Sequence, residues 1–214
     1  MKGIAQIRKD YSRAALDEQG VLPHPMRQFE KWFQQALEAQ VPEPNAMTLA
    51  TTSDQGYPSA RVVLLKGIEG DAFTFFTNYQ SQKGRELTAR PACALNFFWP
   101  DLERQVRVSG VAERISESAS EAYFRSRPRA SQIGAWASPQ STPLANREVL
   151  EERAKKIEDS FAGLTSLPKP RQWGGFSVRP MQVEFWQGRP SRLHDRIVYV
   201  LQPDESWKII RLAP

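Results

Sequence analysis

Residues 47–78 read MTLATTSDQGYPSARVVLLKGIEGDAFTFFTN, a pattern typical of an antiparallel β-sheet. Three short runs, 47–52, 59–67 and 72–78, are rich in the β-branched and aromatic residues that favour strands. The tetrapeptides SDQG (53–56) and IEGD (68–71) separate these runs and contain turn-forming residues. Three short strands with tight connections predict an antiparallel meander.

The strand pattern continues on the C-terminal side of this meander. Further strands are predicted at 92–99, 103–113, 175–178, 181–187, 192–201 and 207–212. Helices are predicted at 26–40, 81–90, 118–125, 129–136 and 146–161, and the first carries Phe29, Trp32, Phe33, Ala36 and Leu37 on one face. Ser118 and Glu121 fit a capping box for the third helix. Antiparallel strands interrupted by helices predict a mainly β fold with α additions, arranged as a closed or nearly closed barrel.

Residues 1–25 are polar, end in Pro-His-Pro and predict an N-terminal arm that leads into a single domain at 26–214. The sequence contains neither GxGxxG nor GxxxxGK[ST], and its strands and helices do not alternate as in βαβ units. A Rossmann or P-loop site is therefore disfavoured. A bound nucleotide would have to be held by side chains on strands.

The composition is that of a globular protein with one sizeable core: 214 residues, 40% hydrophobic and 25% charged, with a net charge of +5. The excess positive charge suits either a nucleic acid or small phosphate ligands. No block of five or six basic residues marks a polyanion-binding surface. We therefore interpret the charge as anion sites inside the fold and expect no nucleic-acid partner.

Cys93 is the single cysteine, and His24 and His194 are the only histidines. This inventory excludes a disulfide within the chain and predicts no metal site of the Cys/His type. The N-terminus lacks the apolar segment of a signal peptide, and no stretch approaches the roughly 20 apolar residues of a membrane span. The expected setting is cytoplasmic, without a membrane partner.

A run of charged residues near the C-terminus, RLHDR (192–196), follows EFWQG (184–188). If the run is a strand, Arg192, His194 and Arg196 share one face, because side chains alternate with period two. That face would offer two fixed guanidinium groups and a side chain that titrates near neutrality. It suits a small, flat, anionic molecule whose protons must move. The alternative is a solvated edge strand.

A second informative run is YFRSRPRASQIGAW (123–136). Tyr123, Arg127 and Ser131 provide a guanidinium fork and two hydroxyl groups, which together can bind a phosphate. The alternative is a solvated run of charges, which the proline at 128 and the tryptophan at 136 make less attractive.

Three further patterns carry weaker indications. Arg61 and Lys66 bracket an apolar strand and suit two anions or two ends of one ligand, although they could simply extend into solvent at the strand ends. The helix start after 75–78, with Thr77, Ser81 and Lys83 nearby, can bind an anion. Gln105 interrupts a strand and can hydrogen-bond the edge of a heterocycle, or it can be a polar residue of an edge strand.

Together these runs resemble the pyridoxamine 5′-phosphate oxidase family. The matching segments are RVVLLK (61–66), FFTN (75–78), ERQVRV (103–108), YFRSRPRASQIGAW (123–136), QS (140–141), WGGF (173–176), EFWQGRPSRLHDR (184–196) and WKIIRLAP (207–214). They extend from the first predicted strands to the last residue. The RPRxSQIGAW and FWQGxxxRLHDR runs are specific.

The resemblance implies a split-barrel fold that binds FMN and acts as a homodimer, with FMN in a cleft between the subunits and with 173–214 as the dimerisation and substrate segment. The residues implied in FMN binding are Arg61, Val62, Val63, Leu64, Leu65, Lys66, Phe76, Thr77, Gln82, Lys83, Gln105, Gln140, Ser141, Trp186 and Arg196. Gln82 departs from the family pattern, which often has a second cation beside Lys83, and this predicts modestly weaker FMN binding.

The resemblance also implies the reaction: oxidation of pyridoxamine 5′-phosphate and pyridoxine 5′-phosphate to pyridoxal 5′-phosphate, with dioxygen as acceptor and hydrogen peroxide released. The residues implied in substrate binding are Arg8, Tyr11, Lys66, Tyr123, Arg127, Ser131, Arg192 and His194. Arg192 and His194 would lie over the reacting pyridine as the catalytic pair, and which of them takes a proton is left open. Arg8 and Tyr11 belong to the arm, which can fold over the site.

A non-catalytic FMN-binding protein, or one similar to flavin reductases, would also explain the flavin residues. It would not need Tyr123, Arg127, Ser131, Arg192 and His194 together.

Overall fold

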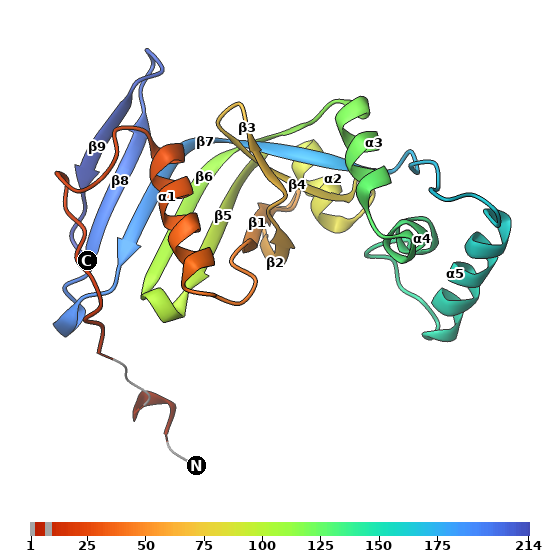
Figure 1. Ribbon diagram of the computed structural model, residues 1–214, viewed down its shortest axis with the longest axis horizontal. Helices are drawn as coiled ribbons and strands as arrows, with labels where there is room; N and C mark the ends of the chain where they lie inside the picture. The colour runs from red at the N-terminus through yellow and green to blue at the C-terminus, as the bar shows by residue number, and fades with distance from the viewer. Residues whose placement is uncertain (1–2, 7–9) are drawn as a thin grey trace.

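The computed structural model describes residues 3–6 and 10–214, which form one sheet with helices on one face and at one end (Figure 1). Its strands are β1 (Ala46–Thr52), β2 (Pro58–Leu64), β3 (Gly67–Glu69), β4 (Ala72–Asn78), β5 (Ala92–Trp99), β6 (Arg104–Arg114), β7 (Trp173–Gln187), β8 (Asp195–Leu201) and β9 (Trp207–Arg211). Its α-helices are α1 (Pro25–Glu38), α2 (Gln82–Ala89), α3 (Glu117–Ser126), α4 (Arg129–Ala137) and α5 (Glu148–Ser160). The mainly β fold with α additions is confirmed.

All strand pairs are antiparallel, in the order β2-β1-β5-β6-β7-β4-β3, with β8 beside β7 and β9 beside β8. Of the meander predicted from 47–78, the hairpin of β1 and β2 is present, with the second strand ending at Leu64. The third strand of that meander is wrong, because β4 pairs with β7 and with a short β3 that replaces part of the predicted turn, at the other end of the strand order from β2. The backbone N–H of Lys66 donates to the carbonyl oxygen of Thr74 at 2.8 Å, so the chain after β2 joins β4. The sheet is thereby partly closed into a barrel, and Lys66 lies where its two ends meet.

Strand β7 joins the two halves of the sheet. Strand β6 pairs along one edge of β7, while β4 pairs with the first part of its other edge and β8 with the last part. The prediction of two separate strands at 175–178 and 181–187 is wrong. A bulge in β7 at Met181, which is skipped between the pairs Ser109–Gln182 and Gly110–Pro180, lets the pairing with β6 continue past Pro180, which has no N–H to donate. Gly110 is required there, because a Cβ would lie 2.3 Å from the carbonyl oxygen of Arg179.

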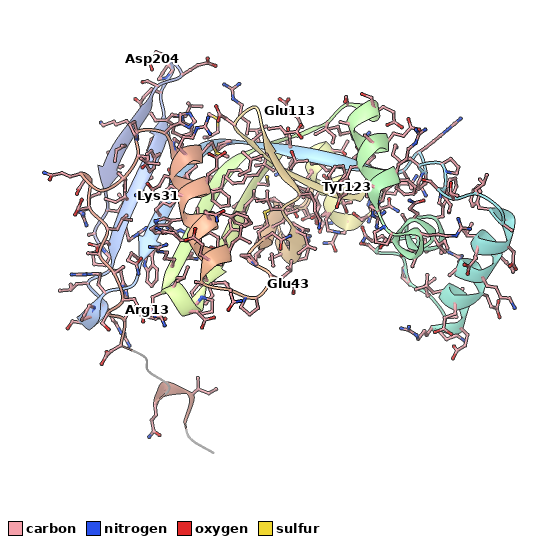
Figure 2. All side chains as sticks on the ribbon, viewed as in Figure 1. Arg13, Lys31, Glu43, Glu113, Tyr123 and Asp204 are labelled. Atoms are coloured by element: carbon pink, nitrogen blue, oxygen red, sulfur yellow. The ribbon has the colours of Figure 1, made fainter. Side chains whose placement is uncertain are left out.

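The main core lies between α1 and the sheet (Figure 2). Phe29 and Trp32 of α1 are buried, and Phe29 contacts Phe73 and Phe97 with ring centroids 4.9 Å apart in each case. The predicted amphipathic face is therefore confirmed for these residues. Leu37, at the end of the same spacing, is 47% exposed because the helix ends one residue later.

A smaller core surrounds Phe124, Ile133, Leu167 and Trp173, where α3, α4 and α5 extend beyond one end of the sheet (Figure 1). Helix α3 begins two residues earlier than the capping box predicts, because Ser116 is the N-cap and its Oγ accepts from the N–H of Ala119 at 3.2 Å. Ser120 is buried and accepts from the N–H of Gly175 at 3.2 Å, which fixes α3 to β7.

The predicted strand at 192–201 begins only at Asp195. Pro190–Arg192 forms a single 3₁₀ turn, and Ser191 and Arg192 have φ angles of 56° and 62°. Left-handed residues interrupt the alternation of side chains that a strand imposes. The expectation that Arg192, His194 and Arg196 share a strand face is therefore wrong, since only Arg196 lies in β8.

No helix within the described ranges has both the length and the apolar character needed to cross a membrane.

Candidate active site

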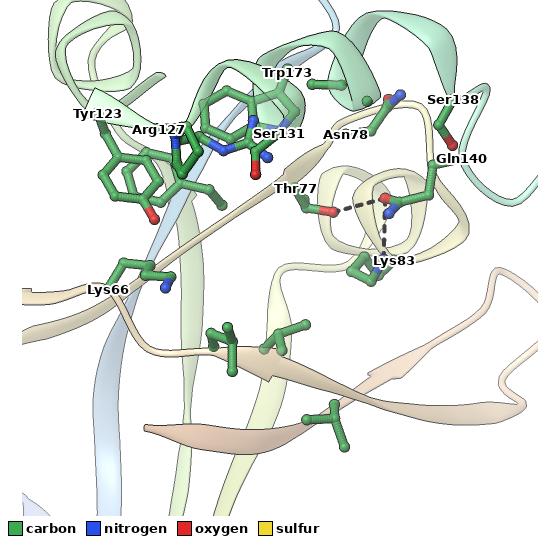
Figure 3. A pocket seen from close by; sticks show the side chains of 17 residues that line it. Lys66, Thr77, Asn78, Lys83, Tyr123, Arg127, Ser131, Ser138, Gln140 and Trp173 are labelled. Carbon is green, nitrogen blue, oxygen red and sulfur yellow. Dashed lines mark hydrogen bonds between the residues drawn. The ribbon is translucent and has the colours of Figure 1, made fainter. Parts of the chain in front are cut away.

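A cavity of about 590 Å³ lies where β2, β4, α3 and α4 meet (Figure 3). Ligand-binding pockets commonly fall in this range of size. Tyr123, Arg127 and Ser131 lie on one side of the cavity, and Thr77, Lys83 and Gln140 lie on another. The cavity therefore offers cationic groups in two separate places.

The first of these places is built around Arg127, the C-cap residue of α3. Its guanidinium lies 4.7 Å from the ring centroid of Trp173, the first residue of β7. Within the described residues, Nη1 of Arg127 is the one buried side-chain nitrogen or oxygen that has no hydrogen-bond partner. Burial lowers the pKa of Arg127, but a guanidinium remains charged at neutral pH. A buried, positively charged donor of this kind is suited to bind an anionic ligand.

An aromatic stack supports this side of the cavity. The rings of Phe76 and Tyr123 are stacked with centroids 3.8 Å apart, and Phe76 is stacked on Trp173 at 5.3 Å. Gln132 of α4 donates from Nε2 to the carbonyl oxygen of Arg127 at 2.9 Å. Rings and backbone thus hold Tyr123 and Arg127 in place without a ligand, so this side of the cavity is preformed.

The second place is the N-terminus of α2. Lys83 is only 9% exposed, and its Nζ donates to Oε1 of Gln140 at 3.4 Å. Thr77, near the end of β4, donates to the same oxygen at 3.1 Å (Figure 3). Burial, and then the nearby Arg61, lower the pKa of Lys83. Among the described residues no carboxylate lies within ion-pair distance of Lys83, so this buried cation also suits an anionic ligand.

The turn from β4 into α2 is tight because of Gly84. A Cβ at this position would lie 2.3 Å from the carbonyl oxygen of Tyr79 and 2.7 Å from that of Asn78. Ser81 caps the helix by accepting from the N–H of Gly84 at 3.2 Å. The close packing of helix start against strand end fixes the direction of Lys83.

Arg61 does not line the cavity. Its Nη2 forms an ion pair with Glu86 of α2 at 3.1 Å. Glu86 is buried and also accepts from Thr51, Ser59 and Gln82. Burial raises the pKa of Glu86, but these hydrogen bonds and Arg61 outweigh it and lower the pKa to about 2. Gln82 thus acts in this structure as a partner of Glu86.

A second cluster of predicted residues lies at the other end of β7. Trp186 pairs with Gln105 of β6 and with Arg196 of β8 across the sheet. The rings of Trp186 and His194 are 4.6 Å apart, and Tyr11 of the N-terminal arm makes an edge contact with each at 5.8 Å. Arg192 precedes this cluster in the exposed 3₁₀ turn.

Hydrogen bonds fix the side chains of both His194 and Arg196. The backbone N–H of Arg189 donates to Nδ1 of His194 at 3.1 Å, so the neutral imidazole carries its proton on Nε2. Burial, and then Arg192, lower the pKa of His194. Arg196 donates to both carboxylate oxygens of Glu184, at 2.8 and 3.1 Å. Glu184 is 2% exposed and also pairs with Arg107, so Arg196 is fixed by a buried carboxylate.

The two clusters cannot form one site within a single chain. Trp173 and Trp186 are thirteen positions apart in one strand, which is roughly 43 Å of extended chain at about 3.3 Å per residue. The labelled Tyr123 and Arg13 mark the cavity end and the arm end and lie far apart in Figure 2. Within one chain the two clusters therefore lie apart.

The structure places the predicted residues in three groups. Those that line the cavity are Val62, Val63, Leu64, Lys66, Phe76, Thr77, Lys83, Tyr123, Arg127, Ser131 and Gln140. Those at or beside the second cluster are Tyr11, Gln105, Trp186, Arg192, His194 and Arg196. Outside both are Arg61 and Gln82, which contact Glu86, Leu65, which is in the core, and Ser141, which is exposed; Arg8 lies outside the described residues.

Several residues that line the cavity were not predicted. They are Asn78, Pro128, Gly134, Ala135, Ser138 and Trp173. Trp173 is the most informative of them, because it supports Arg127. The signal was the WGGF run (173–176), in which a large aromatic residue precedes two glycines. A tryptophan at the start of a strand is ordinarily a core residue, so the sequence alone gave it no role.

Comparisons with known proteins agree along the whole chain. Residues 33–161 match the family described as "Pyridoxamine 5′-phosphate oxidase". Residues 173–214 match a family described as "Pyridoxine 5′-phosphate oxidase C-terminal dimerisation region". The second match coincides with the segment that contains β7, β8 and β9, and it supports a homodimer.

Curated relatives are similar over their full length. A protein of Polynucleobacter asymbioticus named pyridoxine/pyridoxamine 5′-phosphate oxidase is 56% identical over 214 residues, covering 100% of both chains. A protein of Trichormus variabilis with the same name is 55% identical over 211 residues, covering 99% of this chain and 98% of its own.

Solved structures share the fold. PhzG from Burkholderia lata, in complex with tetrahydrophenazine-1-carboxylic acid, superposes with a TM-score of 0.87 at 30% identity and covers 94% of this chain and 98% of its own. An FMN-binding protein of Nostoc punctiforme has a TM-score of 0.71 at 19% identity, with 89% of this chain and 98% of its own covered, and shows the fold alone.

Proposed function

The chain belongs to the pyridoxamine 5′-phosphate oxidase family, and we propose that it oxidises pyridoxamine 5′-phosphate and pyridoxine 5′-phosphate to pyridoxal 5′-phosphate. In this proposal FMN is the cofactor, dioxygen is the electron acceptor and hydrogen peroxide is released. Oxidation of the amine also consumes a water molecule and releases ammonia, whereas oxidation of the alcohol does not.

The observation that carries the proposal is the unpartnered Nη1 of Arg127. A phosphate oxygen placed against it would satisfy a buried cationic donor. Tyr123 and Ser131 line the same side of the cavity and supply hydroxyl groups, and Lys66 adds a second charge. A neutral substrate would leave this group without a partner, so the geometry favours the phosphorylated vitamers over their unphosphorylated forms.

The residues at the other side of the cavity fit the phosphate of FMN. Lys83 is a buried cation at a helix N-terminus, and it donates a hydrogen bond to the amide oxygen of Gln140. Thr77 lies beside it, and Val62, Val63 and Leu64 form an apolar wall on which a flavin ring could rest. The chemistry that FMN supplies when bound is acceptance of two electrons from C4′ and their transfer to dioxygen.

The second cluster would complete the site from the other subunit of a homodimer. In that arrangement Trp186, His194 and Arg196 of one subunit face the cavity of its partner. The separation of the two clusters along β7 and the match to a dimerisation region support this arrangement. Symmetry then gives two identical sites per dimer.

His194 and Arg192 would both act as hydrogen-bond donors to the substrate. Nδ1 of His194 is occupied by the N–H of Arg189, so the free Nε2 carries a proton and donates. Arg192 has no acceptor group and stays protonated, which makes it a poor base. Together they would orient the polar edge of the pyridine ring and stabilise negative charge there, while Arg127 fixes the phosphate.

Peroxide release on addition of pyridoxamine 5′-phosphate to the purified protein tests the proposal. We expect a flavin absorption spectrum, production of peroxide and aldehyde in equal amounts, and much weaker activity with unphosphorylated pyridoxamine. A flavin spectrum without peroxide would favour a non-catalytic flavin protein or a flavin reductase. Absence of flavin binding after incubation with FMN would overturn the proposal.

A further inference from the structure

Glu103, in the turn before β6, occupies a position that is unfavourable for a glutamate in two respects. Its φ and ψ angles are 54° and 38°, the left-handed region in which glycine is at ease and other residues are strained. Its side chain is also buried, with only 3% exposed. A buried carboxylate is costly unless hydrogen bonds or a cation compensate it. The contacts of this carboxylate should therefore explain why a glutamate is found at this position.

Those contacts come from the N-terminal arm. Oε2 of Glu103 accepts from the backbone N–H of Ser12 at 2.8 Å and from that of Arg13 at 3.0 Å. In the part of the chain that the structure describes, no lysine, arginine or histidine lies within ion-pair distance of Glu103. The hydrogen bonds that compensate its charge thus join positions about ninety residues apart in sequence.

The backbone of Glu103 connects this anchor to the second cluster. Its carbonyl oxygen accepts from the N–H of Gly188 at 2.7 Å, just beyond β7. A Cβ on Gly188 would lie 2.7 Å from Cγ of Tyr11 and 3.1 Å from Cβ of Glu103. The glycine thus leaves the space into which the Tyr11 ring fits. Tyr11 in turn contacts Trp186 and His194.

A second contact holds the arm further along. Oδ2 of Asp195 accepts from the N–H of Leu16 at 3.0 Å, and Arg189 donates to the carbonyl oxygen of Ala14 at 3.2 Å. These residues are adjacent to His194 in the fold, so the arm is fixed on both sides of Ala14. Asp195 also forms ion pairs with Arg189 and Arg211, whereas the carboxylate of Glu103 accepts its hydrogen bonds from the backbone of the arm.

We infer that Glu103 is a positioning residue: its carboxylate binds the arm at Ser12 and Arg13 and so holds Tyr11 against Trp186 and His194. The substrate-related part of this inference rests on the proposed function, in which these residues contact the substrate and the flavin. The anchoring itself is a property of the chain and can be measured without substrate.

Glu103→Gly is the variant that separates the side chain from the backbone. Glycine adopts a φ of 54° without strain, so the turn and its hydrogen bond to Gly188 are retained while the carboxylate is lost. Glu205→Gly is the matched control, because Glu205 also has a positive φ of 64° but lies in an exposed turn and pairs with Arg179. Glu103→Gln retains one acceptor oxygen and should give an intermediate result.

Hydrogen–deuterium exchange of peptides covering residues 10–16 is the direct test. In Glu103→Gly we expect their exchange to be about tenfold faster or more, because opening of the arm exposes the amides of Ser12 and Arg13. Exchange should be unchanged in Glu205→Gly. Equal exchange in Glu103→Gly and wild type, or wild-type exchange as fast as in an unfolded peptide, would overturn the anchoring.

Steady-state kinetics test the consequence for the site. In Glu103→Gly we expect KM for pyridoxamine 5′-phosphate to rise about threefold or more, with kcat changed less. If Glu103 acts through Tyr11, Tyr11→Ala should raise KM similarly and the double variant should be no worse than Tyr11→Ala alone. Additive effects would show that Glu103 acts by another route. If the arm exchanges faster in Glu103→Gly than in the wild type while the wild-type protein has no oxidase activity, the anchor is retained and the proposed function is rejected.

Discussion

Trp173 and Trp186 lie at opposite ends of strand β7, and each is packed against one half of the candidate active site. Trp173 supports the guanidinium of Arg127, and Trp186 contacts the imidazole of His194. One strand thus carries parts of two different sites in the proposed dimer. Dimers that combine two different variant subunits can test this arrangement.

We expect two inactive variants to restore activity to each other. Arg127→Ala damages the cavity, and His194→Ala damages the second cluster. In a mixed dimer, one of the two sites therefore combines an intact cavity from one subunit with an intact second cluster from the other. After denaturation and refolding of an equal mixture, half of the dimers are mixed, and activity should reach about a quarter of the wild-type value. No recovery in the mixture, with mixed dimers verified by mass spectrometry, would mean that both residues act within one subunit.

Replacement of Arg127 by alanine should reduce kcat/KM while FMN stays bound. A hydrogen bond to a charged group contributes about 1.5–3 kcal/mol, which corresponds to a fall of about tenfold to over a hundredfold. Arg125→Ala, on the exposed side of α3 and paired with Glu121, is the matched control and should be nearly neutral. If Arg127→Ala retained the wild-type kcat/KM, Arg127 would not be part of the substrate site.

The imidazole of His194 should titrate below its usual pKa of about 6.5, because burial and Arg192 disfavour its charged form. In a His24→Gln background it is the only histidine, so one set of imidazole NMR signals reports its pKa. Arg192→Gln removes a neighbouring positive charge and should raise that pKa. A midpoint above the usual value in the parent protein would contradict the environment described here.

The Glu86 carboxylate should contribute to stability in a defined range of pH. Its pKa is lowered to about 2 in the folded protein, from 4.5 when unperturbed, so its stabilising effect is complete above about pH 4.5 and is lost as pH falls toward 2. At pH 7, Glu86→Gln should reduce the free energy of unfolding by about 1–3 kcal/mol. Urea unfolding at pH 7 and pH 3 measures the difference between wild type and variant, which should shrink at the lower pH. A difference that does not depend on pH would exclude this role of the charge.

Local patterns predicted much of the fold. The strands at 72–78 and 92–99 have the bounds expected from their composition, and Phe29 and Trp32 face the core as the helical spacing predicts. The failures occur where backbone geometry overrides composition. Ser191 and Arg192 are left-handed although neither is glycine, and the bulge at Met181, next to Pro180, depends on how β7 pairs with β6. Neither feature is visible in the residues of one strand alone.

The candidate site was predictable in its residues but not in its arrangement. The motif runs named both the cavity residues and the second cluster, yet spacing in sequence says nothing of the distance that a fifteen-residue strand creates between them. Arg61 shows a second limit of prediction from sequence. Its ion-pair partner Glu86 lies in α2, and nothing in the sequence around Arg61 indicates that pairing. The role of Trp173 also needed the structure, since only there does it meet Arg127.

The length of β7 also limits how the sequence can vary. Insertion of one residue between Trp173 and Trp186 would turn every following side chain to the opposite face, so that Phe185 would leave the core and Glu184 could no longer hold Arg196. Insertions in the connector at 163–171 would cause no such inversion. Functional relatives should therefore differ freely in the size of that connector, while the number of residues from Trp173 to Trp186 stays fixed.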